Sequence, residues 1–301
     1  IQPSRSIFFT WKTKKIAGGD FDQKIDFMGE FSNAFNSMTM QLKEAFEIIE
    51  KQKNDLIRNE REMRRDLKLA AIIQKNLISD KIRINGVAIK TIYTPMILIG
   101  GDIYSFVEFR NEQQFGVFIA DVNGHGVNAA LVTGMIKVLI HSAGEMRRNP
   151  SELLYYINRS FVDFNLDIYF TALYGICDVK NRIFTYARGG HNLPYLIHKN
   201  GAIKELSSDG PMLGVVEEVV IENKTVELET GDKLMLYTDG LSETENDEGV
   251  SFESGALQEI LRINSKMNIE KLINTVYSEL IEYNGSEKFG DDVCILGIEI
   301  L

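Results

Sequence analysis

Aspartates stand at the ends of four apolar runs of this sequence. They follow the run in MILIGGD (96–102), GVFIADVNGHG (116–126) and LMLYTDG (234–240), and they precede it in FGDDVCILGIEI (289–300). These residues are Asp102, Asp121, Asp239 and Asp291, and Asp292 follows the last of them. Four carboxylates in one cleft would repel one another, and their pKa values would rise unless cations neutralised them. Oxygen ligands without His or Cys partners select Mg²⁺ or Mn²⁺. The pattern therefore predicts a site for hard divalent cations, provided that the fold brings these residues together.

A site of this kind favours one type of chemistry. Two hard cations about 3.5–4 Å apart can bridge a water, lower its pKa and bind a phosphoryl group for in-line attack. The reaction would be hydrolysis of a phosphate ester without a protein nucleophile. Aspartates that end strands also serve simply as turn formers, so the spacing alone leaves both interpretations open.

The elements that must position these residues are mixed in kind. After residue 80, apolar segments with strand character are joined by short turns, and helical segments are grouped between them. One predicted helix begins at Asn128 and is apolar nearly all round, which predicts that it is buried. A second follows the break at Asn149-Pro150, with Ser151 as its N-cap. Hairpins of strands with grouped helices predict an α+β sandwich.

The composition limits the classes of function. The 301 residues are 44% hydrophobic, enough for one large domain and an accessory region. Residues 1–80 carry a net charge of +2 and residues 81–301 a net charge of −12. An acidic domain repels nucleic acid and suits divalent cations or a basic protein partner, although much of the charge can simply serve solubility. Cys177 and Cys294 lie in apolar segments without metal-binding spacing, and no apolar run approaches the roughly 20 residues that span a bilayer.

Residues 51–80 are predicted to form a coiled-coil signalling linker. Residues 32–79 contain neither proline nor glycine, and the segment is densely charged. Heptad spacing gives a seam of Phe46, Ile49, Lys53, Leu56, Glu60, Met63, Leu67, Ala70, Gln74 and Leu77. Seven of these ten positions are apolar, and a seam this narrow predicts a two-stranded coiled coil and hence a homodimer.

Residues 1–50 resemble a HAMP domain. They contain a proline at position 3, a connector with the pair Gly19-Asp20, and a second helix of the form E-F-x-x-x-F-N-x-M. The alternative is a generic helical hairpin. Because HAMP domains usually follow a transmembrane helix, the resemblance implies an upstream membrane span and a location at the cytoplasmic face of the inner membrane.

Residues 66–301 resemble the PPM family of metal-dependent serine/threonine phosphatases, in its bacterial SpoIIE/RsbU branch. The ordered matches are DLKLAAIIQKNLIS, GGDIYSF, GVFIADVNGHGVNAALVTGMIK, YFTALYGICDV, ARGGHNLPYLI, GPMLGV, LMLYTDGLSE and GDDVCIL. The resemblance implies a phosphatase domain over residues 81–301, built as a β-sandwich flanked by helices. It also implies two Mn²⁺ or Mg²⁺ ions at one end of the sandwich.

The resemblance also assigns roles to individual residues. The metal ligands it implies are Asp102, Asp121, Asp239 and Asp291. Asp121 would bridge both ions, and the backbone carbonyl of Val122 would bind one of them. Asp292 either replaces Asp291 as a ligand or orients it, and the sequence leaves this choice open.

Three positions differ from the family pattern or lie beside it. Ser105 stands where the family usually has a second aspartate, and loss of an acceptor that supports a ligand would weaken metal affinity about 10- to 100-fold. His125, four residues after Asp121, is either a general acid for the leaving serine or a structural residue of its turn. His191, in GGHNLP, is predicted to shape a turn beside the site.

The helix that leads into the phosphatase domain matches the family's regulatory linker at Ala70, Ile73, Gln74 and Leu77. One interpretation is ordinary packing of this helix on the core. The other is a switch, in which a change of register in the coiled coil repositions the helix against the elements that bear Asp102.

The resemblance therefore predicts a metal-dependent protein serine/threonine phosphatase, regulated by a membrane receptor. The predicted substrate is a phosphorylated anti-sigma-factor antagonist of the STAS type. The alternative is a pseudophosphatase that binds a partner and reports the state of the receptor, which Ser105 favours.

Overall fold

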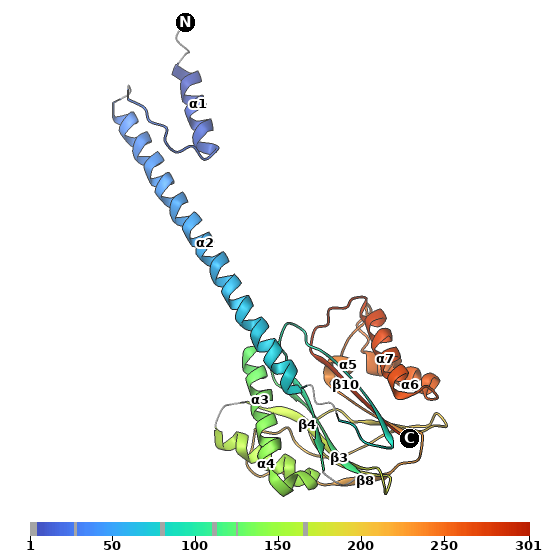
Figure 1. Cartoon of the computed structure of the whole chain (residues 1–301). Helices are drawn as coiled ribbons and strands as arrows, with labels where there is room; N and C mark the ends of the chain where they lie inside the picture. Colours follow the sequence, from blue (N-terminus) through green and yellow to red (C-terminus); the bar gives the residue numbers. More distant parts are fainter. Residues whose placement is uncertain (1–4, 27–28, 79–81, 110–112, 125, 165–167) are drawn as a thin grey trace. The chain divides into compact units, whose positions relative to one another are not determined.

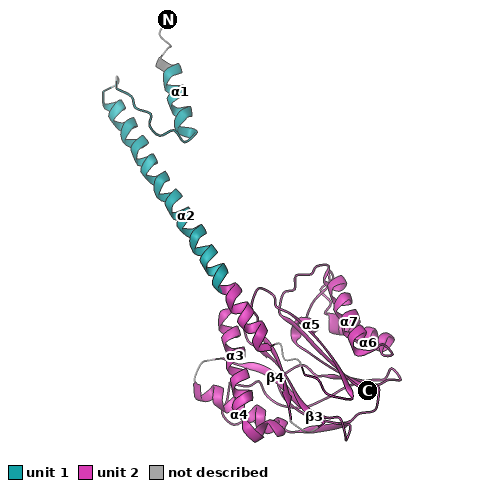
Figure 2. Ribbon diagram, viewed as in Figure 1, with its two compact units in different colours: residues 1–66 teal, residues 67–301 magenta. Residues whose placement is uncertain are grey.

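The computed structural model describes residues 5–26, 29–78, 82–109, 113–124, 126–164 and 168–301. The chain divides into two compact units, residues 1–66 and residues 67–301 (Figure 1, Figure 2). Helix α2 (Glu30–Ile78) crosses this boundary, so that its last twelve residues belong to the second unit.

The first unit is a helix, a connector and a second helix. Helix α1 (Arg5–Ala17) and the start of α2 run in the same direction, and the connector returns between them (Figure 1). The Asn36 side chain fixes the connector, because it accepts a hydrogen bond from the Ile25 amide and donates one to the Ile25 carbonyl, both 2.9 Å long. This arrangement agrees with the predicted helix–connector–helix, and the HAMP assignment itself stays a prediction.

The predicted seam of α2 is exposed to solvent in this single chain. Ile49, Leu56 and Met63 have 61%, 69% and 64% of their surface exposed. A helix that leaves such a row of apolar side chains uncovered is typical of a coiled coil without its partner. Within the described residues, none of the helices combines the length and the apolar character that crossing a bilayer requires.

The second unit contains two five-stranded sheets in which every strand pair is antiparallel. The first sheet has the order β1 (Val87–Thr94), β10 (Val293–Ile300), β9 (Lys233–Tyr237), β6 (Tyr195–Ile197) and β7 (Ile203–Glu205). The second has the order β2 (Asp102–Glu108), β3 (Gln114–Val122), β4 (Phe170–Asp178), β5 (Ile183–Gly189) and β8 (Lys224–Glu227).

Helices cover the outer faces of both sheets, so the unit is a four-layer sandwich (Figure 1). The second sheet is covered by α3 (Val127–Ser142) and α4 (Pro150–Phe164), which are joined by the 3₁₀ turn η1 (Gly144–Arg148). The first sheet is covered by α6 (Gln258–Asn264) and α7 (Ile269–Asn284), and the π-helical turn η2 (Glu253–Leu257) precedes α6. The short helix α5 (Asp239–Ser242) follows β9 directly.

Alternation along the strands explains how one sheet serves two cores. In β9, Leu234 and Leu236 belong to the core between the sheets, whereas Met235 and Tyr237 belong to the core under α6 and α7. Successive side chains of a strand point to opposite faces, and here both faces are buried. The predicted α+β sandwich is therefore confirmed.

Three details of the predicted helices are wrong. Helix α3 begins at Val127 instead of Asn128, and it is not fully buried, because Leu131 and Val138 are mostly exposed. Helix α4 begins at Pro150, where a missing N–H costs nothing. The side chain that accepts hydrogen bonds at its start is that of Asn149, not Ser151.

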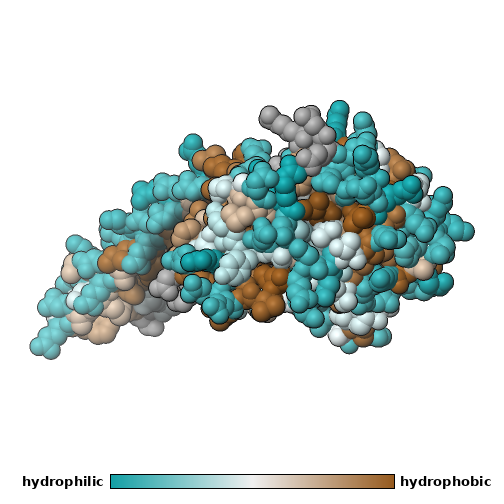
Figure 3. Space-filling view, turned by 90° about the horizontal axis from the view of Figure 1, so that it is seen from below, coloured by the Kyte–Doolittle hydropathy of each residue, from teal (hydrophilic) through white to brown (hydrophobic). Residues whose placement is uncertain are grey.

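Exposed apolar side chains also appear as scattered brown patches on the face in Figure 3.

Candidate metal centre

The strand pair β2–β3 places two of the predicted ligands side by side. Asp102 and Asp121 are directly opposite each other in the register of this pair. Side chains directly opposite on antiparallel strands point to the same face, with Cβ atoms about 4.5–5.5 Å apart. Both carboxyl groups therefore lie at one end of the second sheet, on its inner side.

The other two predicted ligands come from the first sheet. Asp239 begins α5 immediately after β9, and Asp291 lies two residues before β10, which pairs with β9. Both line a cavity of about 400 Å³ whose other lining residues are Gly240, Glu243, Thr244, Glu245, Asn284 and Gly290. The cavity is thus walled by acidic and polar groups.

The pKa values report that the carboxyl groups from the two sheets lie close together. Burial, followed by the charge of Asp121, raises the pKa of Asp102 well above its usual range. Burial and then the charges of Asp239 and Asp291 raise the pKa of Asp121 to about 7. Burial and then Asp291 raise the pKa of Asp239 to about 6, and the Asp121 and Asp239 carboxyl groups share a hydrogen bond. The structure therefore brings all four predicted aspartates to one end of the sandwich.

This cluster suits hard cations, although it is not a closed cage. Within the described ranges, no group of three His, Cys, Asp or Glu side chains has the arrangement of a complete metal site. Mg²⁺ needs no such cage, because it keeps several waters and binds one or two carboxylates. The donors are all oxygens, and their raised pKa values show negative charge that has not been neutralised. Mg²⁺ or Mn²⁺ fits this donor set.

Thr238 is a residue of the candidate site that the sequence analysis missed. Its hydroxyl donates a 2.6 Å hydrogen bond to Asp102 Oδ2 and accepts a 3.0 Å hydrogen bond from the Cys294 amide. Thr238 is fully buried, so it fixes the orientation of a carboxyl group on the opposite sheet. The available signal was a polar residue at the end of the apolar run LMLY.

The adjacent residues Asp291 and Asp292 lie in different surroundings. Asp292 is 4% exposed, and its carboxylate accepts hydrogen bonds from the amides of Met96 (2.7 Å) and Gly101 (2.5 Å). Asp291 is exposed and faces the acidic cavity. The geometry therefore favours Asp291 as the ligand, while Asp292 holds the loop that leads to Asp102.

Two glycines make this close approach possible. A Cβ atom on Gly100 would collide with the Asp292 carboxylate, and a Cβ atom on Gly101 would lie 2.7 Å from the Val122 carbonyl oxygen. The missing Cβ atoms leave room for both oxygens. The Val122 carbonyl, which was predicted to bind one ion, consequently lies beside the loop that Asp292 holds.

Ser105 lies away from the acidic cluster. Its hydroxyl accepts a 2.8 Å hydrogen bond from the buried Lys137 Nζ on α3, which covers the outer face of the second sheet. Asp102, three residues earlier on β2, faces the inner side. The contact with α3 gives no support to Ser105 as a group that acts on the metal ligands.

The two predicted histidine positions differ in outcome. His125 lies outside the described residues. His191 is 2% exposed, and its Nδ1 lies 2.7 Å from Thr171 Oγ1 on β4. It is thus a buried residue between strands, not simply a turn former.

Of the four linker residues, Gln74 makes the contact that matters. Its Nε2 donates hydrogen bonds to the Gly100 carbonyl (2.7 Å) and to Thr133 Oγ1 (3.1 Å), and its Oε1 accepts one from the Gly100 amide (3.2 Å). Ala70 is half-buried, whereas Ile73 and Leu77 are 55% and 41% exposed, so they do not pack into the core.

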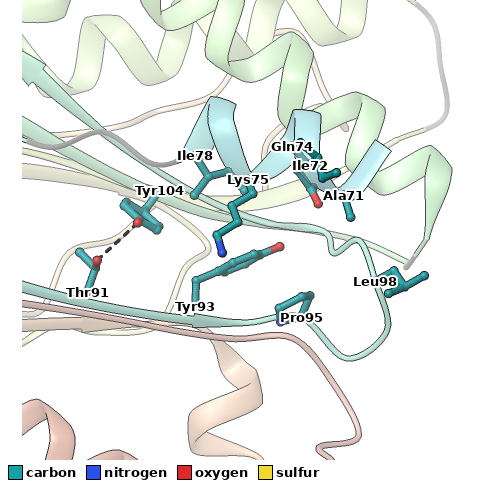
Figure 4. Close-up of a pocket in the computed structure, with 10 residues that line it drawn as sticks. All are labelled: Ala71, Ile72, Gln74, Lys75, Ile78, Thr91, Tyr93, Pro95, Leu98 and Tyr104. Atoms are coloured by element: carbon teal, nitrogen blue, oxygen red, sulfur yellow. Dashed lines mark hydrogen bonds between the residues drawn. The ribbon is translucent and has the colours of Figure 1, made fainter. Parts of the chain in front are cut away.

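Figure 4 shows the last turns of α2 above β1 and the loop that follows it. A cavity of about 410 Å³ lies between them, lined by Ala71, Ile72, Gln74, Lys75, Ile78, Thr91, Tyr93, Pro95, Leu98 and Tyr104. The end of α2 therefore contacts the metal-site loop at Gln74 but leaves space beside it.

The profile of one family, described as Stage II sporulation protein E (SpoIIE), matches residues 111–301. The chain belongs to the SpoIIE family. Two relatives carry names that describe an activity: the phosphoserine phosphatases RsbU and RsbP of Bacillus subtilis (strain 168). RsbU is 27% identical over 241 residues, which cover 79% of this chain and 71% of RsbU. RsbP is 24% identical over 242 residues, which cover 79% of this chain but only 58% of RsbP.

Solved structures agree with this SpoIIE-family assignment at the level of the fold. The SiaA-PP2C domain of Pseudomonas aeruginosa has a TM-score of 0.70 at 22% identity, covering 80% of this chain and 98% of that domain. RsbX, solved in complex with magnesium, has a TM-score of 0.53 at 19% identity, covering 73% of this chain and 98% of RsbX. The PP2C-like fold and the named relatives together support a serine/threonine phosphatase.

Proposed function

We propose that this chain hydrolyses phosphoserine or phosphothreonine in proteins, with two Mg²⁺ or Mn²⁺ ions and a water as the nucleophile. The observation that supports the proposal most directly is the set of carboxyl groups from two sheets whose pKa values are raised by burial and by one another. The relatives named phosphoserine phosphatases support the choice of substrate class.

The residues have separate tasks in this proposal. The oxygen donors would be Asp102, Asp121, Asp239, Asp291 and the Val122 carbonyl, with Asp121 shared by both ions. Asp292 and Thr238 would orient these donors through the hydrogen bonds described above. When bound, such ions lower the pKa of a water and neutralise charge on a phosphoryl group.

The protein's own groups fit hydrolysis without a covalent intermediate. Cys294 is fully buried with a raised pKa, and the Thr238 hydroxyl is committed to Asp102 and to the Cys294 amide. Neither is available as a nucleophile. The water oxygen would then form the new bond to phosphorus, the bond from phosphorus to the serine oxygen would break, and that oxygen would receive a proton.

Hydrolysis of a phosphoserine peptide tests the proposal. Turnover should require Mn²⁺ or Mg²⁺, stop with a chelator, and fall at least about 100-fold in Asp239→Asn. The matched control is Asp247→Asn, a change of an exposed aspartate in the following loop, which should leave turnover unchanged. Full activity in Asp239→Asn would refute the assignment.

The pseudophosphatase alternative has weaker support than hydrolysis. It depended on Ser105, whose hydroxyl contacts Lys137 on the outer face of the sheet. Calorimetry with Mn²⁺ separates the two proposals, because a protein that binds two ions supports the enzyme and a protein that binds none supports the scaffold.

Regulation would act through the last turns of α2, which belong to the same compact unit as the metal site. Gln74 is bonded to both backbone groups of Gly100, and Asp292 is bonded to the next amide, that of Gly101. A shift of the helix would therefore move the loop that ends at Asp102. Turnover should differ between proteins whose coil is locked in two registers, and equal rates would end this proposal.

The partner of α2 would be a second copy of this chain. The exposed apolar seam supports a parallel dimer through residues 1–80. Leu56→Asp should shift the sedimentation of the protein from dimer to monomer. Asn54→Asp, a change off the seam, should leave the dimer intact, and dissociation by both changes would count against the seam.

The location and the substrate protein are proposed from the resemblance alone. The HAMP-like segment would place this part of the chain at the cytoplasmic face of the inner membrane, behind an upstream span. The substrate would be a phosphorylated STAS-type anti-sigma-factor antagonist. The chain should dephosphorylate such a protein with a higher kcat/KM than a short phosphoserine peptide, and equal values would remove the preference.

A further inference from the structure

The aspartates of the candidate metal centre come from two different sheets. Asp102 and Asp121 belong to β2 and β3, whereas Asp239 and Asp291 lie beside β9 and β10 of the other sheet. Two ions share a bridging carboxylate only when their separation is about 3.5–4 Å. The distance between the two sheets at this end of the sandwich therefore decides whether the carboxylates can hold both ions.

His191 contacts a strand of one sheet and lies near the end of a strand of the other. Its Nδ1 contacts Thr171 Oγ1 at 2.7 Å, and Thr171 is directly opposite Asp121 in the β3–β4 register. Its Nε2 is buried and has no hydrogen-bond partner among the described residues. The ring is also near the backbone of Tyr237, two residues before Asp239.

The imidazole of His191 is neutral. Burial, followed by the positive charge of Arg188, lowers its pKa to about 3, and the Tyr237 backbone opposes this effect. One ring nitrogen is then a donor and the other an acceptor. A neutral ring can bridge two strands without adding charge beside the carboxyl groups.

The next residue, Asn192, reaches the helix that begins with Asp239. Its Nδ2 donates a 2.9 Å hydrogen bond to Ser242 Oγ, and Ser242 Oγ donates a 3.3 Å hydrogen bond to the Asp239 carbonyl. Asn192 therefore contacts the last residue of α5, whose hydroxyl in turn contacts the first. One short segment thus contacts the strand beside Asp121 and the helix that presents Asp239.

The segment itself is firmly held. Arg188 Nη1 donates a 2.7 Å hydrogen bond to the His191 carbonyl, and Arg188 Nε donates one to the Ser208 carbonyl. The Gly190 amide donates a 2.9 Å hydrogen bond to the Gly210 carbonyl. Because these hydrogen bonds hold the backbone at Gly190 and His191, the two side chains can act as a rigid spacer.

We infer that His191 and Asn192 are positioning residues that set the spacing between the carboxylates of the two sheets. We call this pair the inter-sheet brace. It touches neither substrate nor ions, and it acts by holding Thr171 and Ser242 in place. Displacements of about 0.5 Å are enough to impair a site of this kind. The inference rests on the proposed two-ion function, but its test also has a readout that does not depend on turnover.

The test compares His191→Phe and Asn192→Ala with the unchanged protein. His191→Phe keeps a ring but loses the bond to Thr171, and Asn192→Ala loses the bond to Ser242. The matched control is His198→Phe, which removes a comparable contact, Nδ1 to Asp232 at 3.1 Å, near the start of β9 and away from Asp239. His191→Asn is the conservative variant, because its amide can occupy the place of Nδ1.

Calorimetry gives the affinities of the two Mn²⁺ ions, and electron paramagnetic resonance detects the spin coupling of a close Mn²⁺ pair. Each brace variant should lose affinity for the second ion about 10- to 100-fold, as when residues behind metal ligands are removed. Its coupled spectrum should weaken, and kcat should fall at least about 10-fold with little change in KM. The control should match the unchanged protein, and His191→Asn should recover part of the loss.

The outcomes separate this inference from the proposed function. If both brace variants bind Mn²⁺ as tightly as the unchanged protein and show the same spin coupling, the inference about the inter-sheet brace is wrong. The proposed phosphatase function would not be affected. A coupled Mn²⁺ pair without turnover in the unchanged protein would refute the phosphatase, and the metal measurements would still decide on the brace. If His191→Phe does not fold, His191→Asn and Asn192→Ala take its place, since unchanged affinity in both overturns the inference.

Discussion

The Thr238 hydroxyl donates a 2.6 Å hydrogen bond to Asp102 although the two residues are 136 positions apart and belong to different sheets. The same oxygen accepts a hydrogen bond from the Cys294 amide on β10. One buried hydroxyl, in the residue that follows β9, therefore joins β10 and β2 beside the acidic cluster. This contact ties the folding of the sandwich to the orientation of a carboxyl group that we propose as a metal ligand.

Replacement of Thr238 by valine should cost both stability and metal affinity. Valine has nearly the same shape, but it leaves Asp102 and the Cys294 amide without their partner. A buried polar group without a partner costs about 1–3 kcal/mol. Chemical denaturation should show a loss of this size, and calorimetry should show Mn²⁺ affinity reduced about 10- to 100-fold. Thr238→Ser keeps the hydroxyl, so its stability and its Mn²⁺ affinity should both stay near those of the parent. Equal losses of stability and affinity in the serine and valine variants would contradict this account.

The two neighbouring aspartates should respond differently to the same change. Asp291→Asn should reduce turnover at least about 100-fold, while the metal-free protein should keep its stability. Asp291 is exposed, and the hydrogen bond that its carboxylate accepts comes from the adjacent Asp292 amide in the same loop, which an asparagine oxygen can also accept. Asp292→Asn should lower stability as well, because an amide cannot accept from both Met96 and Gly101 as the carboxylate does. Turnover and thermal midpoints of the two variants check this. An unstable Asp291→Asn with a stable Asp292→Asn would reverse the assignment.

The sequence predicted the sandwich because alternation and turn signals are local properties. Apolar segments joined by short turns, with helical segments grouped between them, were enough to predict the strands and helices of an α+β sandwich. It also predicted the four aspartates, because the stretches around them have a recognisable order along the chain. The division of labour between Asp291 and Asp292 was not predictable, since adjacent identical residues differ only in which one turns inward.

Contacts between distant segments explain the other misses. Thr238 and His191 act through partners on other strands, and no spacing within one chain segment reports such a pair. Ser105 lies three positions after Asp102 on β2, so alternation places it on the opposite face, and what the sequence could not show is that α3 brings Lys137 to that face. The predicted cap Ser151 was wrong because Asn149, two residues earlier, already accepts the hydrogen bonds at that helix start.

The glycine at position 100 should not tolerate a side chain. A Cβ atom there would collide with the Asp292 carboxylate, which would have to leave the amides that it binds. Overpacking of this kind costs typically about 1–3 kcal/mol. Gly100→Ala should therefore lower the thermal midpoint and turnover together. Gly134→Ala is the matched control. Gly134 lies within α3, and a Cβ atom added to it would come no closer than 4.0 Å to Leu77 Cδ1, so alanine should stabilise α3 by up to about 1 kcal/mol. A Gly100→Ala protein that behaves like the control would show that the loop adapts freely.

Proton release should accompany Mn²⁺ binding and should depend on pH in a defined direction. In the metal-free protein the pKa of Asp121 is about 7 and that of Asp239 is about 6. Cations bind the ionised carboxylates, so below these values binding must displace protons. The apparent affinity for Mn²⁺ should therefore rise between about pH 5.5 and pH 7.5 and then level off. Calorimetry in buffers with different ionisation enthalpies counts the protons, and an affinity that does not change over this range would mean that these carboxyl groups do not bind the ion.

The same two carboxyl groups should make the metal-free protein less stable as the pH rises. Their raised pKa values mean that the folded state binds more protons than the unfolded chain between about pH 4 and pH 7. The contribution of these two groups to the free energy of unfolding is full when the pH is below about 3.9, the pKa of an aspartate in the unfolded chain. It is lost as the pH rises through their folded-state pKa values of about 6–7. The lowered pKa of His191 makes the protein more stable as the pH rises, which is the opposite effect. His191 is present in both the parent and the Asp239→Asn variant, so its effect cancels when their stabilities are compared. Without metal, Asp239→Asn should thus gain stability over the parent on going from pH 5 to pH 8, and saturating Mn²⁺ should reverse the order by stabilising the parent alone. A stability difference that stays constant with pH would show that Asp239 is not crowded by the other carboxylates.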